Sequence, residues 1–221
     1  DLSSEGNVFG LDESQRPTMD DLVHRLDEPA ILDGVRDTGG RVTLAVYRCP
    51  KPVIAAINGP AVGIGATMTL PMDVRIASEN ARIGFVFGRL GIVPEACSTW
   101  FLPRIVGISR ALEMAYSAEI LDAQQALAAG LVREVVAPDD LLPTAYALAH
   151  RFVDGRSPVA TALMRQMLYR NSAQPDPLAA HAASDAGRRA HAQLMGDINQ
   201  YRTGHATAHQ PAQTTAPVIT R

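Results

Sequence analysis

A glycine-rich turn between two apolar segments constrains the fold of this chain more than any other feature of its sequence. Residues 51–78 are KPVIAAINGPAVGIGATMTLPMDVRIAS, and Gly59, Gly63 and Gly65 fall within seven residues of this segment. Glycine has no Cβ, so the backbone there can turn sharply and approach a ligand closely. Three uses of such a turn are open: a phosphate-binding loop, a tight structural turn, or a set of backbone N–H donors for an oxyanion.

The segments on either side of the glycines predict an α/β fold. Val53–Ile57 is short, apolar and rich in β-branched residues, which predicts a buried strand. Gly65–Leu70 predicts a short helix, and Val74–Ala77 predicts a second strand. The order strand, turn, helix, strand is typical of an α/β protein.

The remainder of the chain predicts more helix than strand. Asp122 suits the N-cap position and Gly130 the C′ position of one of these helices. Pro29 and the pair Gly39-Gly40 are expected to break residues 18–48 into two helical pieces. The further predicted elements are helices at residues 109–119, 122–130, 139–154 and 158–170, and a strand at residues 131–138. We expect a core at residues 1–155, a helical region at residues 156–204 and a loose tail at residues 205–221.

The composition argues against two classes of partner. The 221 residues are 47% hydrophobic, but no apolar run approaches the roughly 18 residues of a membrane-spanning helix, so we expect no membrane partner. The net charge of −3 comes from mixed charges without a basic stripe, so we expect no nucleic-acid partner. Cys49 and Cys97 lack CxxC spacing and fit a cytoplasmic protein. Because the chain does not begin with Met, we expect its natural N-terminus to lie upstream of Asp1.

The nucleotide-binding uses of the turn fit the residues poorly. A dinucleotide-binding GxGxxG motif would need a third Gly or Ala where this chain has Met68. A P-loop would need Gly-Lys-Ser/Thr, which does not follow the glycines. A structural turn and an oxyanion site with backbone donors therefore remain open.

Residues 51–165 resemble the crotonase family, that is, the enoyl-CoA hydratase/isomerase superfamily. The segments KPVIAAINGPAVGIGA, DVRIAS, LGIVP, LPRIVG and DAQQALAAGLV occur in the order and at the spacing of that family. The resemblance implies an α/β spiral of repeated ββα turns, with a C-terminal helical region through which members assemble as trimers or dimers of trimers. It also places the first turns of the spiral, and a first oxyanion donor, upstream of Asp1.

The resemblance implies that the glycine turn is half of an oxyanion hole. Family members stabilise the enolate of an acyl-CoA thioester with two backbone N–H groups, and Ile64 matches the second of these donors. Gly63 and Gly65 would let that backbone approach the thioester. The two catalytic glutamates of a hydratase match Thr67 and Phe87, which cannot exchange a proton near neutral pH. Both positions are then expected to contact the substrate; the alternatives are an ordinary place in the apolar core for Phe87 and a hydrogen bond of the Thr67 hydroxyl to its own helix backbone.

Glu95 offers another carboxylate, in the segment GIVPEACSTWFLP. A glutamate after this proline resembles the peroxisomal-type Δ3,Δ2-enoyl-CoA isomerases of the superfamily, in which one carboxylate moves a proton between C2 and C4. The resemblance makes Glu95 the catalytic residue and Pro94 a substrate-binding one. From the residues alone, a solvated loop carboxylate or a cap of the following helix is the alternative.

We therefore expect an enoyl-CoA isomerase that shifts a double bond between C3 and C2, with the Ile64 N–H as oxyanion donor and Glu95 as proton shuttle. The alternatives are a hydratase-like enzyme of altered activity and a non-catalytic subunit that binds acyl-CoA or serves assembly. No metal and no cofactor are expected, because coenzyme A is part of the substrate. Whether Glu95 faces the same cavity as the Ile64 N–H distinguishes the isomerase from the binding subunit.

Overall fold

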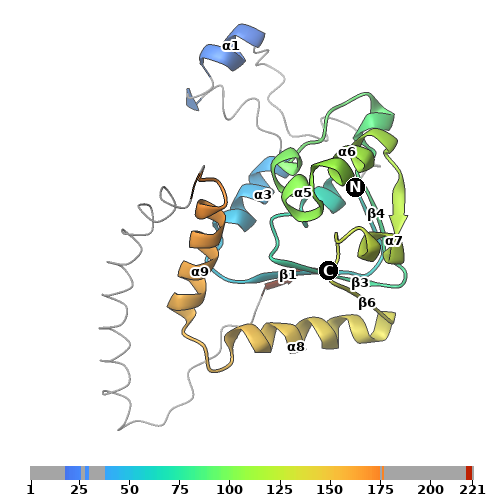
Figure 1. Cartoon of the computed structure of the whole chain (residues 1–221), viewed down its shortest axis with the longest axis vertical. Coiled ribbons are helices and arrows are strands. Elements are labelled where there is room, and N and C mark those ends of the chain that lie inside the picture. Colours follow the sequence, from blue (N-terminus) through green and yellow to red (C-terminus); the bar gives the residue numbers. More distant parts are fainter. Residues whose placement is uncertain (1–17, 26–27, 30–37, 175, 177–217, 221) are drawn as a thin grey trace. The chain divides into compact units, whose positions relative to one another are not determined.

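The computed structural model describes residues 18–25, 28–29, 38–174, 176 and 218–220. Figure 1 shows the helices and strands of these residues, coloured along the sequence. The chain divides into two compact units. The first comprises residues up to Arg48 and Ala55–Leu142, and the second comprises Cys49–Ile54 and Pro143–Thr220. The predicted domain limits at residues 155 and 204 stay predictions.

Short strands form two sheets in the described part of the chain. The strands are β1 (Val53–Ile57), β2 (Pro60–Val62), β3 (Val74–Ser78), β4 (Arg82–Gly84), β5 (Ile120–Asp122), β6 (Glu134–Val136) and β7 (Val218–Thr220). One sheet has the order β6-β3-β1-β7 and the other the order β2-β4-β5. β3 pairs with β6 and β2 with β4 in parallel, whereas β4 and β5 are antiparallel. The strands expected from the sequence correspond to β1, β3 and β6, and the three-stranded sheet was not among the predictions.

β1 forms as predicted because its residues can be buried on both faces. All five of its side chains are buried, as expected for an apolar strand inside a sheet. β3 becomes buried toward its end, at Ile76, Ala77 and Ser78, which lie opposite β6 in the parallel register. These two strands enclose the glycine turn in the sequence and hold its ends.

The helices account for most of the remaining described residues. They are α1 (Met19–His24), α3 (Thr38–Arg48), α4 (Ile64–Thr67), α5 (Ser98–Val106), α6 (Ile108–Ser117), α7 (Ala123–Ala128), α8 (Leu141–Val153) and α9 (Pro158–Asn171), with the 3-10 helices η1 (Val86–Leu90) and η2 (Pro138–Asp140). The helices predicted for 109–119, 122–130, 139–154 and 158–170 correspond to α6, α7, α8 and α9. Asp122 is the N-cap of α7 in a capping box with Gln125, and Gly130 follows with a φ of 74°.

The predicted break at Gly39-Gly40 is wrong. Both glycines lie inside the first turn of α3, and both are buried. A glycine costs a helix only about 1 kcal/mol relative to alanine, and tertiary packing can offset that cost. The predicted break at Pro29 lies next to residues 30–37, which are outside the described residues. Of the predicted loose tail, only residues 218–220 are described, and they form β7.

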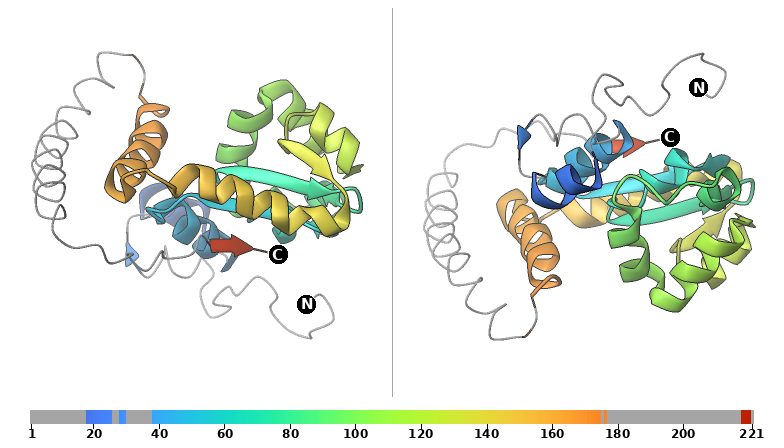
Figure 2. Two further views of the ribbon diagram at one scale, coloured as in Figure 1. Left: turned by 90° about the horizontal axis from the view of Figure 1, so that it is seen from below. Right: turned by 90° about the horizontal axis from the view of Figure 1, so that it is seen from above.

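α5 and α6 form a helical hairpin in the first unit, joined at Gly107, whose φ is 81°. Figure 2 shows the two helices side by side. An aromatic cluster anchors α5: the ring of Trp100 packs edge-to-face with Phe101 at 4.6 Å and with Tyr47 of α3 at 6.1 Å, measured between centroids. Arg104 lies over the Trp100 ring at 3.9 Å, a cation–π contact. This hairpin forms one side of the cavity described below.

Candidate active site

The glycine turn is held in a conformation that favours glycine. Gly63 is the N-cap of α4, with φ 59° and ψ −122°. A Cβ added at Gly63 would meet nothing within 4 Å, so the conformation rather than a lack of space explains the glycine. The Gly63 N–H donates to the Gly84 carbonyl oxygen at 3.0 Å, which ties the turn to the end of β4.

The first two N–H groups of α4 have no acceptor among the described residues. The Gly63 carbonyl accepts the N–H of Thr67 at 3.0 Å, but within the described part of the chain no acceptor is found for the N–H of Ile64 or Gly65. The first N–H groups of a helix have no intrahelical partner. The Ile64 side chain is 41% exposed, so this side of the turn reaches the surface of the chain. The turn thus offers two backbone donors to an oxygen ligand.

Thr67 and Phe87, the two positions that we match to the hydratase glutamates from the sequence resemblance, are both buried. The Thr67 hydroxyl donates to the Ile64 carbonyl at 3.4 Å, a bond within its own helix. Phe87 lies in η1, and its side chain is only 3% exposed. Neither side chain carries a carboxylate, so this chain lacks the two acids at those positions. Their contact with a substrate stays a prediction.

Arg75 fastens the segment that follows α4 and was not identified from the sequence. Its Nη1 donates to the carbonyl oxygens of Thr69, Leu70 and Met72 at 3.3, 3.3 and 2.7 Å, and its Nε donates to that of Leu131 at 2.8 Å. A helix of one turn is marginal by itself, so such anchoring matters. A charged residue inside the apolar segment DVRIAS was the signal available in the sequence.

Glu95 lies in a strained loop before α5. The side chain is half-buried, and the Ser98 N–H and hydroxyl both donate to the Glu95 carbonyl oxygen. The next two residues, Ala96 and Cys97, have φ of 54° and 56°. Left-handed conformations cost a non-glycine residue about 1–2 kcal/mol each, so the surroundings must hold this loop in place.

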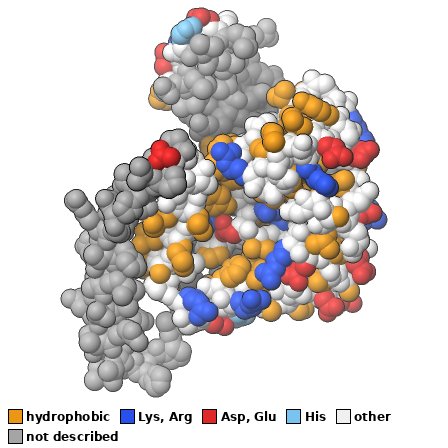
Figure 3. All heavy atoms as spheres, viewed as in Figure 1, with side chains coloured by type: hydrophobic (Ala, Val, Ile, Leu, Met, Phe, Trp, Pro, Cys, Tyr) orange, Lys and Arg blue, Asp and Glu red, His pale blue; other side chains and the backbone are white. Residues whose placement is uncertain are grey.

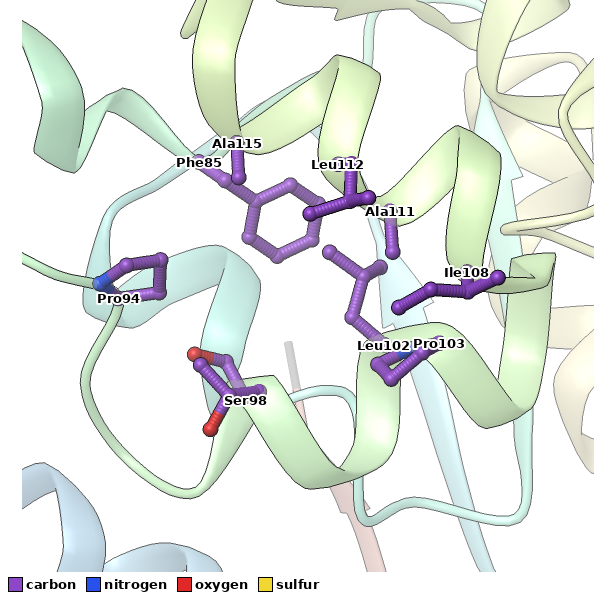
Figure 4. Close-up of a pocket in the computed structure, with 10 residues that line it drawn as sticks. Phe85, Pro94, Ser98, Leu102, Pro103, Ile108, Ala111, Leu112 and Ala115 are labelled. Carbon is purple, nitrogen blue, oxygen red and sulfur yellow. The ribbon is translucent and has the colours of Figure 1, made fainter.

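An apolar cavity of about 150 Å³ lies beside this loop (Figure 4). Figure 4 shows Phe85, Leu102 and Leu112 pointing toward one another across it, with Pro94 and Ser98 on one side. Of the predicted site residues, only Pro94 is among the described residues that line it. The lining residues are Phe85, Pro94, Ser98, Thr99, Leu102, Pro103, Ile108, Ala111, Leu112 and Ala115.

Neither a metal-binding cluster nor a membrane-spanning helix is found among the described residues. No cluster of three or more His, Cys, Asp or Glu side chains suited to a metal ion occurs among them. None of the helices in the described ranges has the length and apolarity needed to cross a membrane.

The fold and this site define an α/β protein with a turn that offers backbone donors and with an apolar cavity beside the Glu95 loop. Residues 21–200 match the protein family described as Enoyl-CoA hydratase/isomerase. The chain belongs to this family, within the crotonase superfamily, and the predicted crotonase-type α/β fold is confirmed.

Known proteins of this family resemble the chain over part of their length. Enoyl-CoA hydratase ACTT3 of Alternaria alternata is 45% identical over 145 residues, which are 65% of this chain and 49% of that protein. The chain thus spans about half the length of the curated relatives that it matches first. A monofunctional enoyl CoA isomerase from M. smegmatis is 35% identical, with a TM-score of 0.58 over 65% of this chain and 67% of that chain. A putative enoyl-CoA hydratase from Thermobifida fusca YX, solved in complex with CoA, is 28% identical, with a TM-score of 0.64 over 70% and 60%.

Proposed function

We propose that this protein is an enoyl-CoA isomerase that moves a double bond between C3 and C2 of an acyl-CoA thioester. The Ile64 N–H hydrogen-bonds the thioester oxygen as negative charge develops on it, and Glu95 removes a proton at C2 and returns it at C4, or the reverse. Enolate formation and reprotonation need one base and no water. Coenzyme A enters as part of the substrate.

The observation that carries the proposal is the Ile64 N–H, which has no acceptor among the described residues of a chain that belongs to this family. Backbone donors preorganised for an oxyanion supply a large part of the stabilisation of an enolate-like transition state. The relative solved in complex with CoA supports an acyl-CoA thioester as the ligand.

Two observations favour the isomerase over the hydratase. Water addition by two glutamates has no carboxylate to use at Thr67 and Phe87. Glu95 sits before two residues in the left-handed conformation, and strain of this kind is typical of functional loops. In addition, one of the solved structures that this chain resembles, from M. smegmatis, is named an enoyl CoA isomerase.

A hydratase-like activity is the second candidate, because the curated relatives with the highest identity carry that name. Glu95 would then have to activate water by itself. The expected sign of this activity is conversion of 2-enoyl-CoA to a 3-hydroxyacyl-CoA. We also propose that the protein is cytoplasmic and that it assembles into trimers or dimers of trimers. Cell fractionation would test the location, and light scattering would test the assembly.

An assay of the purified protein against a panel of 2-enoyl- and 3-enoyl-CoA thioesters tests the proposal. We expect 3-enoyl-CoA to be converted to the 2-trans isomer, with little hydration of the 2-enoyl-CoA. Glu95→Gln keeps the size of the side chain and removes the base, so it should abolish isomerisation and leave acyl-CoA binding within about twofold, since a neutral amide retains most contacts of the side chain.

The matched control is Glu113→Gln, which makes the same change on the exposed face of α6 and should keep full activity. Full isomerase activity of Glu95→Gln would show that Glu95 is not the base. Acyl-CoA binding without turnover of either substrate class by the unaltered protein would favour the non-catalytic binding subunit.

A further inference from the structure

We propose that the cavity between the Glu95 loop and the α5–α6 hairpin receives the tail of the acyl group and limits its length. The cavity is apolar and holds about 150 Å³ (Figure 4). This inference rests on the proposed function, because that function supplies the acyl-CoA thioester. To that function the inference adds a preference for the length of the acyl tail, and it names the cavity residues that determine this preference.

The cavity wall includes one residue of the loop that carries Glu95 and one residue beside the hydrogen-bond partner of the glycine turn. Phe85 points into the cavity and follows Gly84, whose carbonyl oxygen accepts the Gly63 N–H at the oxyanion turn. Pro94 lines the cavity and directly precedes Glu95. Neither Ile64 nor Glu95 is among the described residues that line the cavity, but one wall residue is next in sequence to Glu95 and another is one hydrogen bond away from the glycine turn.

The walls suit a hydrocarbon tail. Phe85, Leu102, Leu112 and their neighbours present carbon to the cavity. Ser98 and Thr99 also line it, and the Ser98 hydroxyl donates its hydrogen to the Glu95 carbonyl. Because the other lining side chains are apolar, a polar tail would lose most of its hydrogen bonds to water on entering, whereas an alkyl tail has none to lose.

The volume sets a limit on the length of the tail. An apolar cavity of about 150 Å³ holds a molecule of about six carbon atoms, such as benzene. The reaction uses the thioester carbon and the carbons up to C4, so the tail begins at C5. The cavity then accepts acyl groups of up to about ten carbon atoms in total.

Two small residues of α6 keep the cavity open, and two larger ones lie at its edge. Ala111 and Ala115 are one helical turn apart and line the cavity with methyl groups. Ile108 and Leu112 line it as well, although they are 65% and 41% exposed. Hydrophobic side chains also reach the surface of this unit in the space-filling view (Figure 3). A longer side chain at Ala115 would fill the space, and a shorter one at Leu112 would enlarge it.

Binding of saturated acyl-CoA thioesters tests the inference without any catalytic step. Isothermal titration calorimetry would give the Kd of the protein for coenzyme A and for butanoyl-, hexanoyl-, octanoyl-, decanoyl- and tetradecanoyl-CoA. Each buried CH₂ is worth about fourfold in Kd at most, so we expect Kd to fall steadily up to about decanoyl-CoA and then to level off.

The variants Ala115→Leu and Leu112→Ala should move this limit in opposite directions. Ala115→Leu adds three carbons to the wall, so Kd should stop falling at about hexanoyl- to octanoyl-CoA, and decanoyl-CoA should bind about tenfold more weakly than to the unaltered protein. Leu112→Ala removes three carbons, so the fall should continue beyond decanoyl-CoA. Glu113→Gln, on the same helix but outside the cavity, should leave the whole series unchanged.

A Kd that does not depend on chain length in the unaltered protein would overturn the inference. So would a Leu112→Ala series identical to that of the unaltered protein, and this second variant decides the matter if Ala115→Leu fails to fold. A chain-length dependence of the expected form in a protein without isomerase activity would support the cavity and contradict the reaction. The reverse result, isomerisation with equal binding of all chain lengths, would contradict the cavity and support the reaction.

Discussion

Replacing Ile64 by proline removes the proposed oxyanion donor with little other change. Ile64 is the first residue of α4, where proline is tolerated because that N–H has no intrahelical acceptor. The preceding residue, Gly63, has a ψ of −122°, which lies outside the α region that a following proline disfavours. The side chain is 41% exposed, so its loss from the turn costs little packing.

The expected effect is a fall in kcat for isomerisation of a 3-enoyl-CoA. Loss of one oxyanion donor costs about 100-fold to 1,000-fold in kcat, which is about 2.7–4 kcal/mol of transition-state stabilisation. KM should change much less, because the neutral thioester carbonyl of the ground state is a weaker acceptor than the enolate oxygen.

Ile64→Ala is the matched control, since it shortens the same side chain and keeps the N–H. It should retain kcat within about threefold, as expected for a partly exposed surface residue. Steady-state kinetics of both variants would be compared with their thermal unfolding midpoints. The reasoning would be refuted by a folded Ile64→Pro protein that keeps kcat within about threefold of Ile64→Ala.

Three further predictions concern the stability of the described parts. Arg75→Met should lower the free energy of unfolding by about 3 kcal/mol in urea titrations, because four carbonyl oxygens, including that of Leu131, lose a charged donor; a loss below about 1 kcal/mol would contradict this. Thr43→Val should raise the free energy of unfolding by about 1 kcal/mol, since the buried Thr43 hydroxyl has no partner among the described residues; a decrease would speak against it. Two hydrogen bonds from Arg25 hold the pKa of Glu28 below its ordinary value of 4.5. The ion pair is therefore present above pH 4.5 and is lost as the pH falls through the lowered pKa, and a carboxyl NMR titration giving 4.5 or more would exclude it.

The sequence predicts the elements whose pattern is long or unmistakable. β1 is a run of five apolar residues between Pro52 and Asn58-Gly59, so its strand character is local. α7 carries its own start signal in the capping box of Asp122 and Gln125. In both cases the residues of the element themselves decide the conformation.

β2, β4 and β5 escape prediction because each has three residues, too few to show a period, and none lies in a longer partly alternating segment such as the LVREVVAP that contains β6. Their strand character comes from pairing with one another, and β4 and β5 lie 35 or more residues apart in the chain. At the start of α3 the sequence predicts a break that the structure does not have. The two glycines there have a weak helix propensity, but their burial in the fold outweighs it.

For the candidate site, the turn could be found from the sequence and the cavity could not. The glycines at 63 and 65 mark the turn directly, and the φ of 59° at Gly63 explains one of them. The left-handed residues Ala96 and Cys97 carry no such signal, because alanine and cysteine rarely adopt that conformation. The cavity needs Phe85, Pro94 and the α5–α6 hairpin together, which only the fold brings side by side.

A crystal structure of the protein with hexanoyl-CoA would test the central claim most directly. The account predicts a thioester oxygen at about 2.7–3.1 Å from the Ile64 nitrogen, the distance at which an oxyanion donor acts. It also predicts that the Glu95 carboxylate faces C2 and C4 of the acyl group, and that the end of the acyl chain enters the cavity beside Phe85. A thioester oxygen out of hydrogen-bond reach of Ile64, with the Glu95 carboxylate turned away from the acyl group, would contradict it.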